Sequence, residues 1–311
     1  MPHPAVPSHQ AVRPTAWIRP QALCETLGLD VTLACEIGQH TGSFKFRAAY
    51  HLASNVPHPL IITASSGNFG QALAYACKLL GKACIVVMPT TSARVKVEAV
   101  KRHGGRVEPV DTAVTPRAQR VAELAAVYPE AYVASAYDDL LVIAGNASLG
   151  AEIAAHAPRF DVVVAPVGGG GLTAGIIQGI RAAGAPIEVV GAEPAMANDA
   201  ARSLATGAIV AHAVEPQTIA DGARTVSLGR HNFPVLQSGM AGIIEVAESA
   251  IREGLRRLHA EAGLRAEPTG ALALGAVLTA PGRFAGKRVC VVVSGGNVDA
   301  EVFEGLLRAD A

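Results

Sequence analysis

The chain has 311 residues with 26 basic and 26 acidic side chains, and its sequence pI is about 7.2. Proteins that bind nucleic acids usually carry an excess of Lys and Arg, so this balance argues against a nucleic-acid partner. Hydrophobic residues make up 50% of the chain and charged residues 17%, with 32 glycines. This composition is typical of parallel sheets covered by Ala-rich helices.

The N-terminus is rich in proline and has no apolar segment, so we predict no secretory signal and expect a cytoplasmic protein. The longest uncharged stretch, residues 162–180, is interrupted by Pro166, four consecutive glycines and Gly175. We therefore predict a strand, a loop and a helix there, and no contact with a membrane. The five cysteines are odd in number and form no C-x-x-C pair, so neither a disulfide framework nor a structural zinc site is indicated.

In chain order, the first distinctive stretch is residues 41–50, TGSFKFRAAY, which places Lys45 between two phenylalanines. Partly apolar surroundings disfavour the ammonium form of a lysine, and the neutral amine is the better nucleophile and base. Schiff-base chemistry needs such an amine. A single lysine is more often a surface residue with an apolar stem, so this interpretation depends on the segments that follow.

Short apolar runs then alternate with Ala-rich helical segments. Strands are predicted at residues 60–64, 83–89, 131–135, 161–167, 187–194 and 287–296. Helices are predicted at residues 70–81, 92–104, 143–157 and 172–184. The alternation predicts βαβ units with right-handed crossovers, and hence an α/β fold with a mostly parallel sheet.

Polar loops containing glycine follow three of the predicted strands, at residues 65–70, 167–172 and 294–297. Ligands of parallel sheets bind beyond the carboxyl ends of the strands, where these loops lie. In the second loop, four glycines precede a helix and leave backbone N–H groups unobstructed, which predicts a phosphate site. A dinucleotide site is the alternative, because Gly169, Gly171 and Ala174 fit G-x-G-x-x-A and Glu193 follows in the next strand. The position of this motif, midway along the chain, counts against a nicotinamide cofactor.

The other two loops add further binding groups. Ser65, Ser66 and Asn68 precede a helix whose dipole favours an anion, so a carboxylate or a ring oxygen could bind there. Ser294 ends the last predicted strand, and its hydroxyl could hydrogen-bond a heterocyclic nitrogen without carrying charge. A reactive amine, a phosphate site and a partner for a ring nitrogen are together the groups required to hold pyridoxal phosphate.

The motifs TGSFKFRAA, SSGNFGQA, PVGGGGL, GAEP, TIADGARTVSLG, EPTGALAL and VVVSGGNVD extend over nearly the whole chain. Because these motifs occur in the same order and with similar spacing, the sequence resembles the serine/threonine dehydratase and serine racemase family of fold-type II pyridoxal-phosphate enzymes. The resemblance implies a tryptophan synthase beta-like fold of two domains, with mostly parallel sheets flanked by helices. The large domain would comprise residues 1–52 and 139–311, and the small mobile domain residues 53–138. A homodimer is also implied.

The resemblance further implies a role for each matching residue. Lys45 would form the internal aldimine, and Ser66 would be the second acid/base on the opposite face of the ring. The residues implied to hold the cofactor are Phe44, Lys45, Asn68, Gly168, Gly169, Gly170, Gly171 and Ser294. Those implied to bind the amino-acid substrate are Ser65, Ser66, Asn68 and Phe69.

A divalent-cation site is implied as well, at Glu193, the carbonyl of Ala197 and Asp199. Their hard oxygen atoms suit Mg²⁺ or Ca²⁺. In this role Glu193 would not be a ribose ligand. From the residues alone, the two carboxylates could equally be ordinary surface acids.

The implied reaction is α,β-elimination of water from a threonine-like or serine-like β-hydroxy amino acid, giving a 2-oxo acid and ammonia. Racemisation is the main alternative, with Ser66 as the second acid/base. Replacement at the β-carbon, as in cysteine synthases, is disfavoured by the unbroken glycine run. A nicotinamide-dependent oxidoreductase and a non-catalytic ligand-binding protein are the remaining alternatives.

Two features bear on the choice among these reactions. The segment SAYDDLLVIAG is similar to the dehydratase form of this stretch, in which an aromatic residue precedes two acidic ones. Tyr137 is the aromatic residue here, and it favours elimination. Phe69 and residues 145–148 depart from the usual family pattern near the expected substrate position. A bulkier or more polar β-hydroxy amino acid therefore stays open as the substrate.

Overall fold

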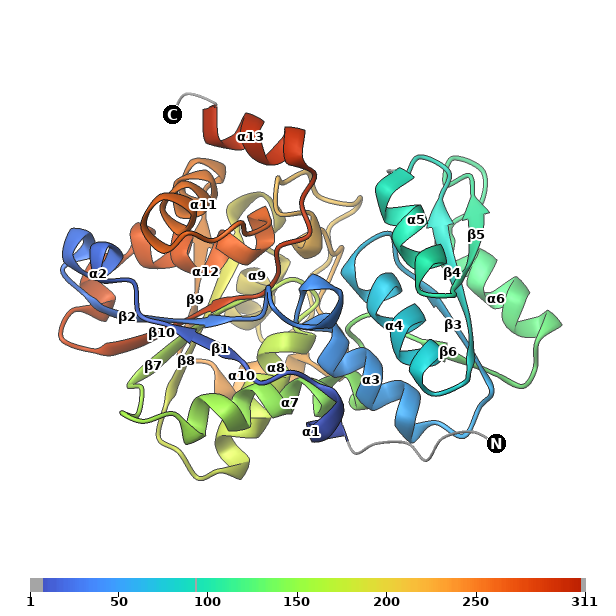
Figure 1. Ribbon diagram of the computed structural model, residues 1–311, viewed down its shortest axis with the longest axis horizontal. Coiled ribbons are helices and arrows are strands. Elements are labelled where there is room, and N and C mark those ends of the chain that lie inside the picture. Colours follow the sequence, from blue (N-terminus) through green and yellow to red (C-terminus); the bar gives the residue numbers. More distant parts are fainter. Residues whose placement is uncertain (1–7, 93, 309–311) are drawn as a thin grey trace.

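The computed structural model describes residues 8–92 and 94–308. The N-terminal segment behind the prediction of no secretory signal therefore lies partly outside the described residues. Figure 1 shows two bodies, each built around its own sheet. No helix within the described residues is both long and apolar enough to cross a membrane.

The larger sheet has six strands in the order β1-β2-β10-β7-β8-β9, and only β1, at one edge, pairs antiparallel to its neighbour. Its strands are β1 (Ala16–Ile18), β2 (Asp30–Cys35), β7 (Val162–Pro166), β8 (Glu188–Pro194), β9 (Gly242–Val246) and β10 (Arg288–Val293). The smaller sheet is fully parallel in the order β5-β4-β3-β6. Its strands are β3 (Leu60–Ala64), β4 (Ala83–Pro89), β5 (Arg106–Val110) and β6 (Ala131–Ala134).

The helices cover the faces of both sheets. They are α1 (Ser8–Ala11), α2 (Gln21–Leu27), α3 (Lys45–Asn55), α4 (Asn68–Leu79), α5 (Arg94–Arg102), α6 (Arg117–Val127), α7 (Leu140–Ala155), α8 (Gly171–Ala182), α9 (Asp199–Thr206), α10 (Phe233–Gly239), α11 (Glu248–Ala262), α12 (Pro268–Thr279) and α13 (Ala300–Arg308). Short 3-10 helices lie at His40–Gly42, Ala195–Ala197, Asp221–Ala223 and Pro281–Phe284.

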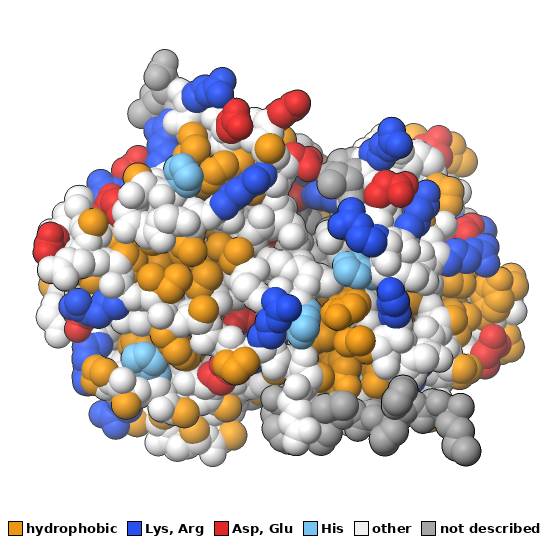
Figure 2. All heavy atoms as spheres, in the orientation of Figure 1, with side chains coloured by type: hydrophobic (Ala, Val, Ile, Leu, Met, Phe, Trp, Pro, Cys, Tyr) orange, Lys and Arg blue, Asp and Glu red, His pale blue; other side chains and the backbone are white. Residues whose placement is uncertain are grey.

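Burial on both faces explains the apolar strands. Every residue of β7 is buried, because α11 and α12 pack on one side of the larger sheet and α7 and α8 on the other. In the smaller sheet, α4 and α6 pack on opposite faces of β3 and β4. Figure 2 shows basic and acidic side chains scattered together over the face in view, as the balanced charge of the chain leads us to expect.

The predicted α/β fold with two mostly parallel sheets is confirmed. All six predicted strands are present with ends shifted by at most a few residues, whereas β1, β2, β5 and β9 were not predicted. The four predicted helices correspond to α4, α5, α7 and α8. The smaller sheet lies inside residues 53–138, but the division into a large domain and a mobile small domain stays a prediction.

Candidate active site

A cavity of about 1090 Å³ lies where loops from the two sheets face each other. Every residue predicted to bind the cofactor or the substrate lines it. These residues are Phe44, Lys45, Ser65, Ser66, Asn68, Phe69, Gly168, Gly169, Gly170, Gly171 and Ser294. The loops after β7 and β10 leave from the carboxyl edge of the larger sheet, and the loop after β3 leaves from the carboxyl edge of the smaller one.

Lys45 is the first residue of α3, and the backbone around it is fixed by the loop after β10. Ser43 pairs with Gly295 in an isolated bridge, and the Phe44 N–H donates to the Ser294 carbonyl at 3.0 Å. The Lys45 side chain is half-buried, and its Nζ donates to the carbonyl of Ala136 at 2.9 Å.

The surroundings of the Lys45 amine make it an unusual lysine. Its Nζ lies 5.0 Å from the centre of the Phe44 ring and 5.8 Å from that of Phe69. Burial lowers the pKa of the amine from 10.5 to about 8, against the opposing effect of the Glu267 carboxylate. More of the amine is therefore neutral near physiological pH than in an ordinary lysine.

The glycine loop begins α8, and its backbone conformation needs glycine. Gly170 has a φ of +91°, and a methyl group on Gly169 would lie only 2.2 Å from Cδ2 of Tyr137. The N–H groups of Gly168, Gly169 and Gly170 donate to no other group within the described chain. They are therefore available to an anion at the N-terminus of α8.

Ser294 directly follows β10, and its side chain is only 1% exposed. Its hydroxyl has no hydrogen-bond partner within the described chain. Leaving a buried hydroxyl without a partner costs about 1–3 kcal/mol, which indicates that a ligand supplies the partner. This orphaned hydroxyl, the free N–H groups of the glycine loop and the Lys45 amine fit pyridoxal phosphate, which offers a ring nitrogen, a phosphate and an aldehyde.

Both serines of the loop after β3 line the cavity, and one of them also has a structural role. Ser65 Oγ accepts hydrogen bonds from the N–H groups of Gly67 and Gly70, at 3.3 and 3.1 Å, and so supports the start of α4. Ser66 is half-buried and lines the cavity. The side chain of Asn68 donates to Glu267 and accepts from Asn297, both at 2.8 Å.

Glu267 was missed in the sequence analysis as a site residue. It directly precedes Pro268 at the start of α12, is 5% exposed and lines the cavity. Burial raises the pKa of its carboxyl to about 7. The available signal was an acidic residue before a helix-starting proline in the EPTG motif, but its partner Asn68 lies 199 positions away in the chain.

The two carboxylates of the predicted cation site are not ordinary surface acids, because Glu193 is 0% and Asp199 1% exposed. Glu193 accepts from the N–H groups of Ala200 and Ala201, at 2.7 and 2.8 Å, and so caps α9. Both oxygens of Asp199 lack a hydrogen-bond partner within the described chain, and Nε2 of His212 lies 3.7 Å away. Burial raises the pKa of Glu193 to about 8 and that of Asp199 to about 7. Ala197 closes the short 3-10 helix between them.

The described residues contain no cluster of three His, Cys, Asp or Glu side chains that could hold a metal ion. The predicted site uses two carboxylates and one backbone carbonyl, so its occupation by a cation stays a prediction. The structure argues against the alternative of a dinucleotide site with Glu193 as the ribose ligand. The Glu193 carboxylate is fully buried and accepts hydrogen bonds from the N-terminus of α9.

Comparison with known proteins adds independent information. The family model described as "Pyridoxal-phosphate dependent enzyme" matches residues 9–295. The chain is 35% identical over 285 residues to the L-threo-3-hydroxyaspartate ammonia-lyase of a Pseudomonas species, covering 90% of this chain and 89% of that protein. It is 34% identical over 290 residues to human serine racemase, covering 89% and 84%. The crystal structure of a threonine deaminase from T.th. superposes with a TM-score of 0.88 and 38% identity, covering 94% of this chain and 95% of that one.

Proposed function

The chain belongs to the family of pyridoxal-phosphate dependent enzymes, and from this premise we propose that it is a dehydratase of a β-hydroxy amino acid. The products would be a 2-oxo acid and ammonia. The relatives above are named for 3-hydroxyaspartate, serine and threonine, which are all hydroxy amino acids. The observation that carries the proposal is the cavity that joins the Lys45 amine, the glycine loop and the Ser294 hydroxyl.

In this proposal the glycine loop holds the phosphate through its free N–H groups. Ser294 would face the ring nitrogen, Asn68 would bond the phenolic oxygen, and Phe44 would pack beside the ring. The loop of residues 65–69 binds the substrate carboxylate, with Ser66 and the start of α4 closest to it. A divalent cation at Glu193, Ala197 and Asp199 belongs to the same proposal.

The bound cofactor supplies an acceptor for the electron pair left on Cα when its proton departs. Lys45 takes that proton as the general base, a role suited to an amine whose pKa is lowered to about 8. Ser294 would offer a neutral hydroxyl to the ring nitrogen, and unlike a carboxylate it would not fix a proton there. Such a setting would favour loss of the β-hydroxyl.

Racemisation is the second candidate, and the position of Ser66 favours it. Its hydroxyl lines the same cavity as the Lys45 amine, so it could return a proton to Cα from another direction. Elimination and racemisation begin with the same proton removal. They differ in whether the β-hydroxyl leaves before a proton returns.

The test is to assay the protein, loaded with pyridoxal phosphate, against both enantiomers of serine, threonine and 3-hydroxyaspartate. We expect equal amounts of 2-oxo acid and ammonia from at least one of them, and a loss of about 100-fold or more in Lys45→Ala. Lys101→Ala, an exposed lysine on α5, is the matched control and should keep full activity. Enantiomer formed without 2-oxo acid would support the racemase, and no reaction of any substrate would contradict both.

A further inference from the structure

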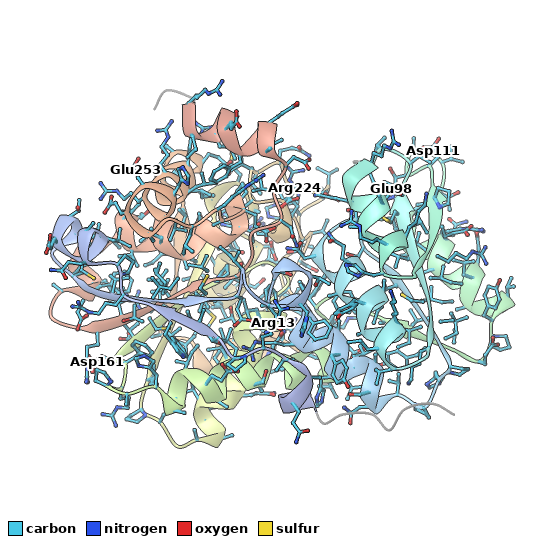
Figure 3. All side chains as sticks on the ribbon, in the orientation of Figure 1. Arg13, Glu98, Asp111, Asp161, Arg224 and Glu253 are labelled. Carbon is cyan, nitrogen blue, oxygen red and sulfur yellow. The ribbon has the colours of Figure 1, made fainter. Side chains whose placement is uncertain are left out.

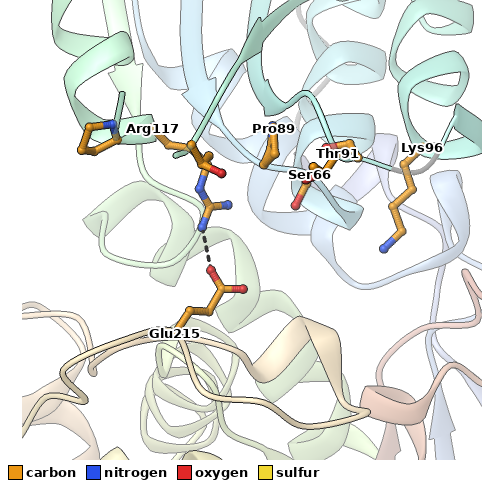
Figure 4. A pocket seen from close by; sticks show the side chains of 9 residues that line it. Ser66, Pro89, Thr91, Lys96, Arg117 and Glu215 are labelled. Atoms are coloured by element: carbon orange, nitrogen blue, oxygen red, sulfur yellow. Dashed lines mark hydrogen bonds and ion pairs between the residues drawn. The ribbon is translucent and has the colours of Figure 1, made fainter. Parts of the chain in front are cut away.

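The mouth of the cavity carries a second group of charges that the proposed chemistry does not use. Figure 4 shows Arg117 and Lys96, from the helices of the smaller sheet, around a pocket of about 500 Å³ that also contains Ser66. Nη2 of Arg117 lies 3.1 Å from Glu215, and Nζ of Lys96 lies 2.8 Å from Asp221. Both carboxylates come from the segment between α9 and α10. These two cations therefore already have carboxylate partners.

Apart from the Lys45 amine, which the proposed chemistry uses, Arg224 is the cation on the cavity lining that has no carboxylate partner within the described residues. It lies on the same segment, lines the main cavity, and is labelled between the two bodies in Figure 3. Its Nε and Nη2 donate to the Thr218 carbonyl at 2.8 and 2.6 Å. Its Nη1 makes no hydrogen bond within the described chain, and no carboxylate lies within ion-pair distance of the side chain.

The third acid at the cavity does not compensate this charge. Glu267 accepts from the side chain of Asn68, and its pKa is raised to about 7, so part of it is uncharged near neutral pH. With Arg117 and Lys96 paired, the positive charge of the half-buried Arg224 guanidinium has no carboxylate partner on the cavity lining. A guanidinium binds a carboxylate with strong, directional, charge-assisted hydrogen bonds.

We propose that Arg224 binds a second carboxylate on the substrate, so that the preferred substrate is a β-hydroxy amino dicarboxylic acid of the 3-hydroxyaspartate kind. This inference rests on the proposed function and narrows its substrate class. The α-carboxylate lies at the loop of residues 65–69, and the β-carboxylate turns toward Arg224. Serine and threonine leave that guanidinium without an anion.

The experiment compares Arg224→Gln, Arg224→Lys and the control Arg230→Gln as loaded enzymes, with 3-hydroxyaspartate and serine as substrates. Arg230 lies on the same segment, is exposed and does not line the cavity. We expect Arg224→Gln to lower kcat/KM for 3-hydroxyaspartate by about 10- to 100-fold, the range for a lost charge-assisted hydrogen bond. The value for serine should change by less than about 3-fold. Arg224→Lys should recover part of the loss, and Arg230→Gln should behave as the unmodified protein.

Binding of succinate, compared with butyrate, tests the same site without turnover. Succinate should bind more tightly than butyrate, and Arg224→Gln should remove the difference. An equal loss for both substrates in Arg224→Gln would overturn the inference, because Arg224 would then only hold its segment in place. Turnover of serine without turnover of 3-hydroxyaspartate would also overturn it while leaving the dehydratase intact. If neither substrate gave a 2-oxo acid, the proposed function would fail and the succinate measurement alone would decide the role of Arg224.

Discussion

At the scale of single residues, the Lys45 amine links burial to a dependence of stability on pH. Its pKa is about 8 in the folded protein and 10.5 in an ordinary lysine. Between these two values the unfolded chain binds more protons than the folded one. The free energy of unfolding of the cofactor-free protein should therefore rise as the pH increases from about 8 to 10.5.

Replacing this lysine removes the buried charge. We expect Lys45→Met to raise the free energy of unfolding of the cofactor-free protein at pH 7 by about 1–3 kcal/mol, and to flatten its rise above pH 8. Urea unfolding at pH 7, 8.5 and 9.5 measures both effects. Lys101→Met, at an exposed position on α5, should change neither. A slope in Lys45→Met equal to that of the unmodified protein would show that the pKa of this amine is not lowered.

Sequence analysis found the site residues that belong to contiguous motifs and missed those defined by distant partners. Lys45, the glycine loop and Ser294 each lie in a short, recognisable pattern, and all line the cavity. Arg224 stands in a recognised motif too, but its importance depends on which cations are already paired. The two residues of one pair are separated by 98 positions in the sequence and those of the other by 125. No local pattern reveals such pairs.

At the scale of elements, the turn from β7 into α8 combines an unusual backbone conformation with tight packing. Gly170 has a φ of +91°, and an added methyl group would lie 3.1–3.2 Å from Asn232, Leu228 and Leu236. Gly170→Ala should therefore lower the free energy of unfolding by about 1–3 kcal/mol and weaken the binding of pyridoxal phosphate. Urea unfolding and titration with the cofactor measure the two effects.

Gly184 provides a matched control for this substitution. It also has a positive φ, +63°, but an added methyl group would meet no atom within 4 Å, and the residue lies away from the cavity. Gly184→Ala should thus cost stability through strain alone and leave cofactor affinity unchanged. Equal cofactor affinities in the two variants would contradict a phosphate site at the glycine loop.

Three of the strands that were not predicted, β1, β5 and β2, have identifiable physical reasons. β1 has only three residues, and β5 carries Arg106, Glu108 and Pro109 at the edge of its sheet. Edge strands need not be apolar on both faces, so their sequences lack the strong signal of β4 or β7. β2 is apolar, but it pairs with β10 from the other end of the chain, and nothing in its own neighbourhood indicates a βαβ unit.

At the scale of the whole molecule, the two ion pairs at the cavity mouth join the body of the smaller sheet to the segment before α10. Both pairs are partly exposed, with 30–48% of each side chain accessible. Such pairs contribute about 0–1 kcal/mol each because water and salt screen them. We therefore expect them to bias the relative position of the two bodies only weakly.

Removing both carboxylates tests this bias. In Glu215→Gln combined with Asp221→Asn, amide hydrogens of α5 and α6 should exchange faster, while the free energy of unfolding falls by less than about 2 kcal/mol. Hydrogen-exchange mass spectrometry measures the exchange rate of each helix separately. In the unmodified protein, about 0.5 M salt should also speed the exchange of α5 and α6, because salt screens the two ion pairs. Asp30→Asn, which breaks the exposed pair between Arg19 and Asp30 within the body of the larger sheet, should leave α5 and α6 unchanged. Unchanged exchange in the double variant would mean that other contacts, such as the hydrogen bonds of Asn68 with Glu267 and Asn297, hold the two bodies together without these ion pairs.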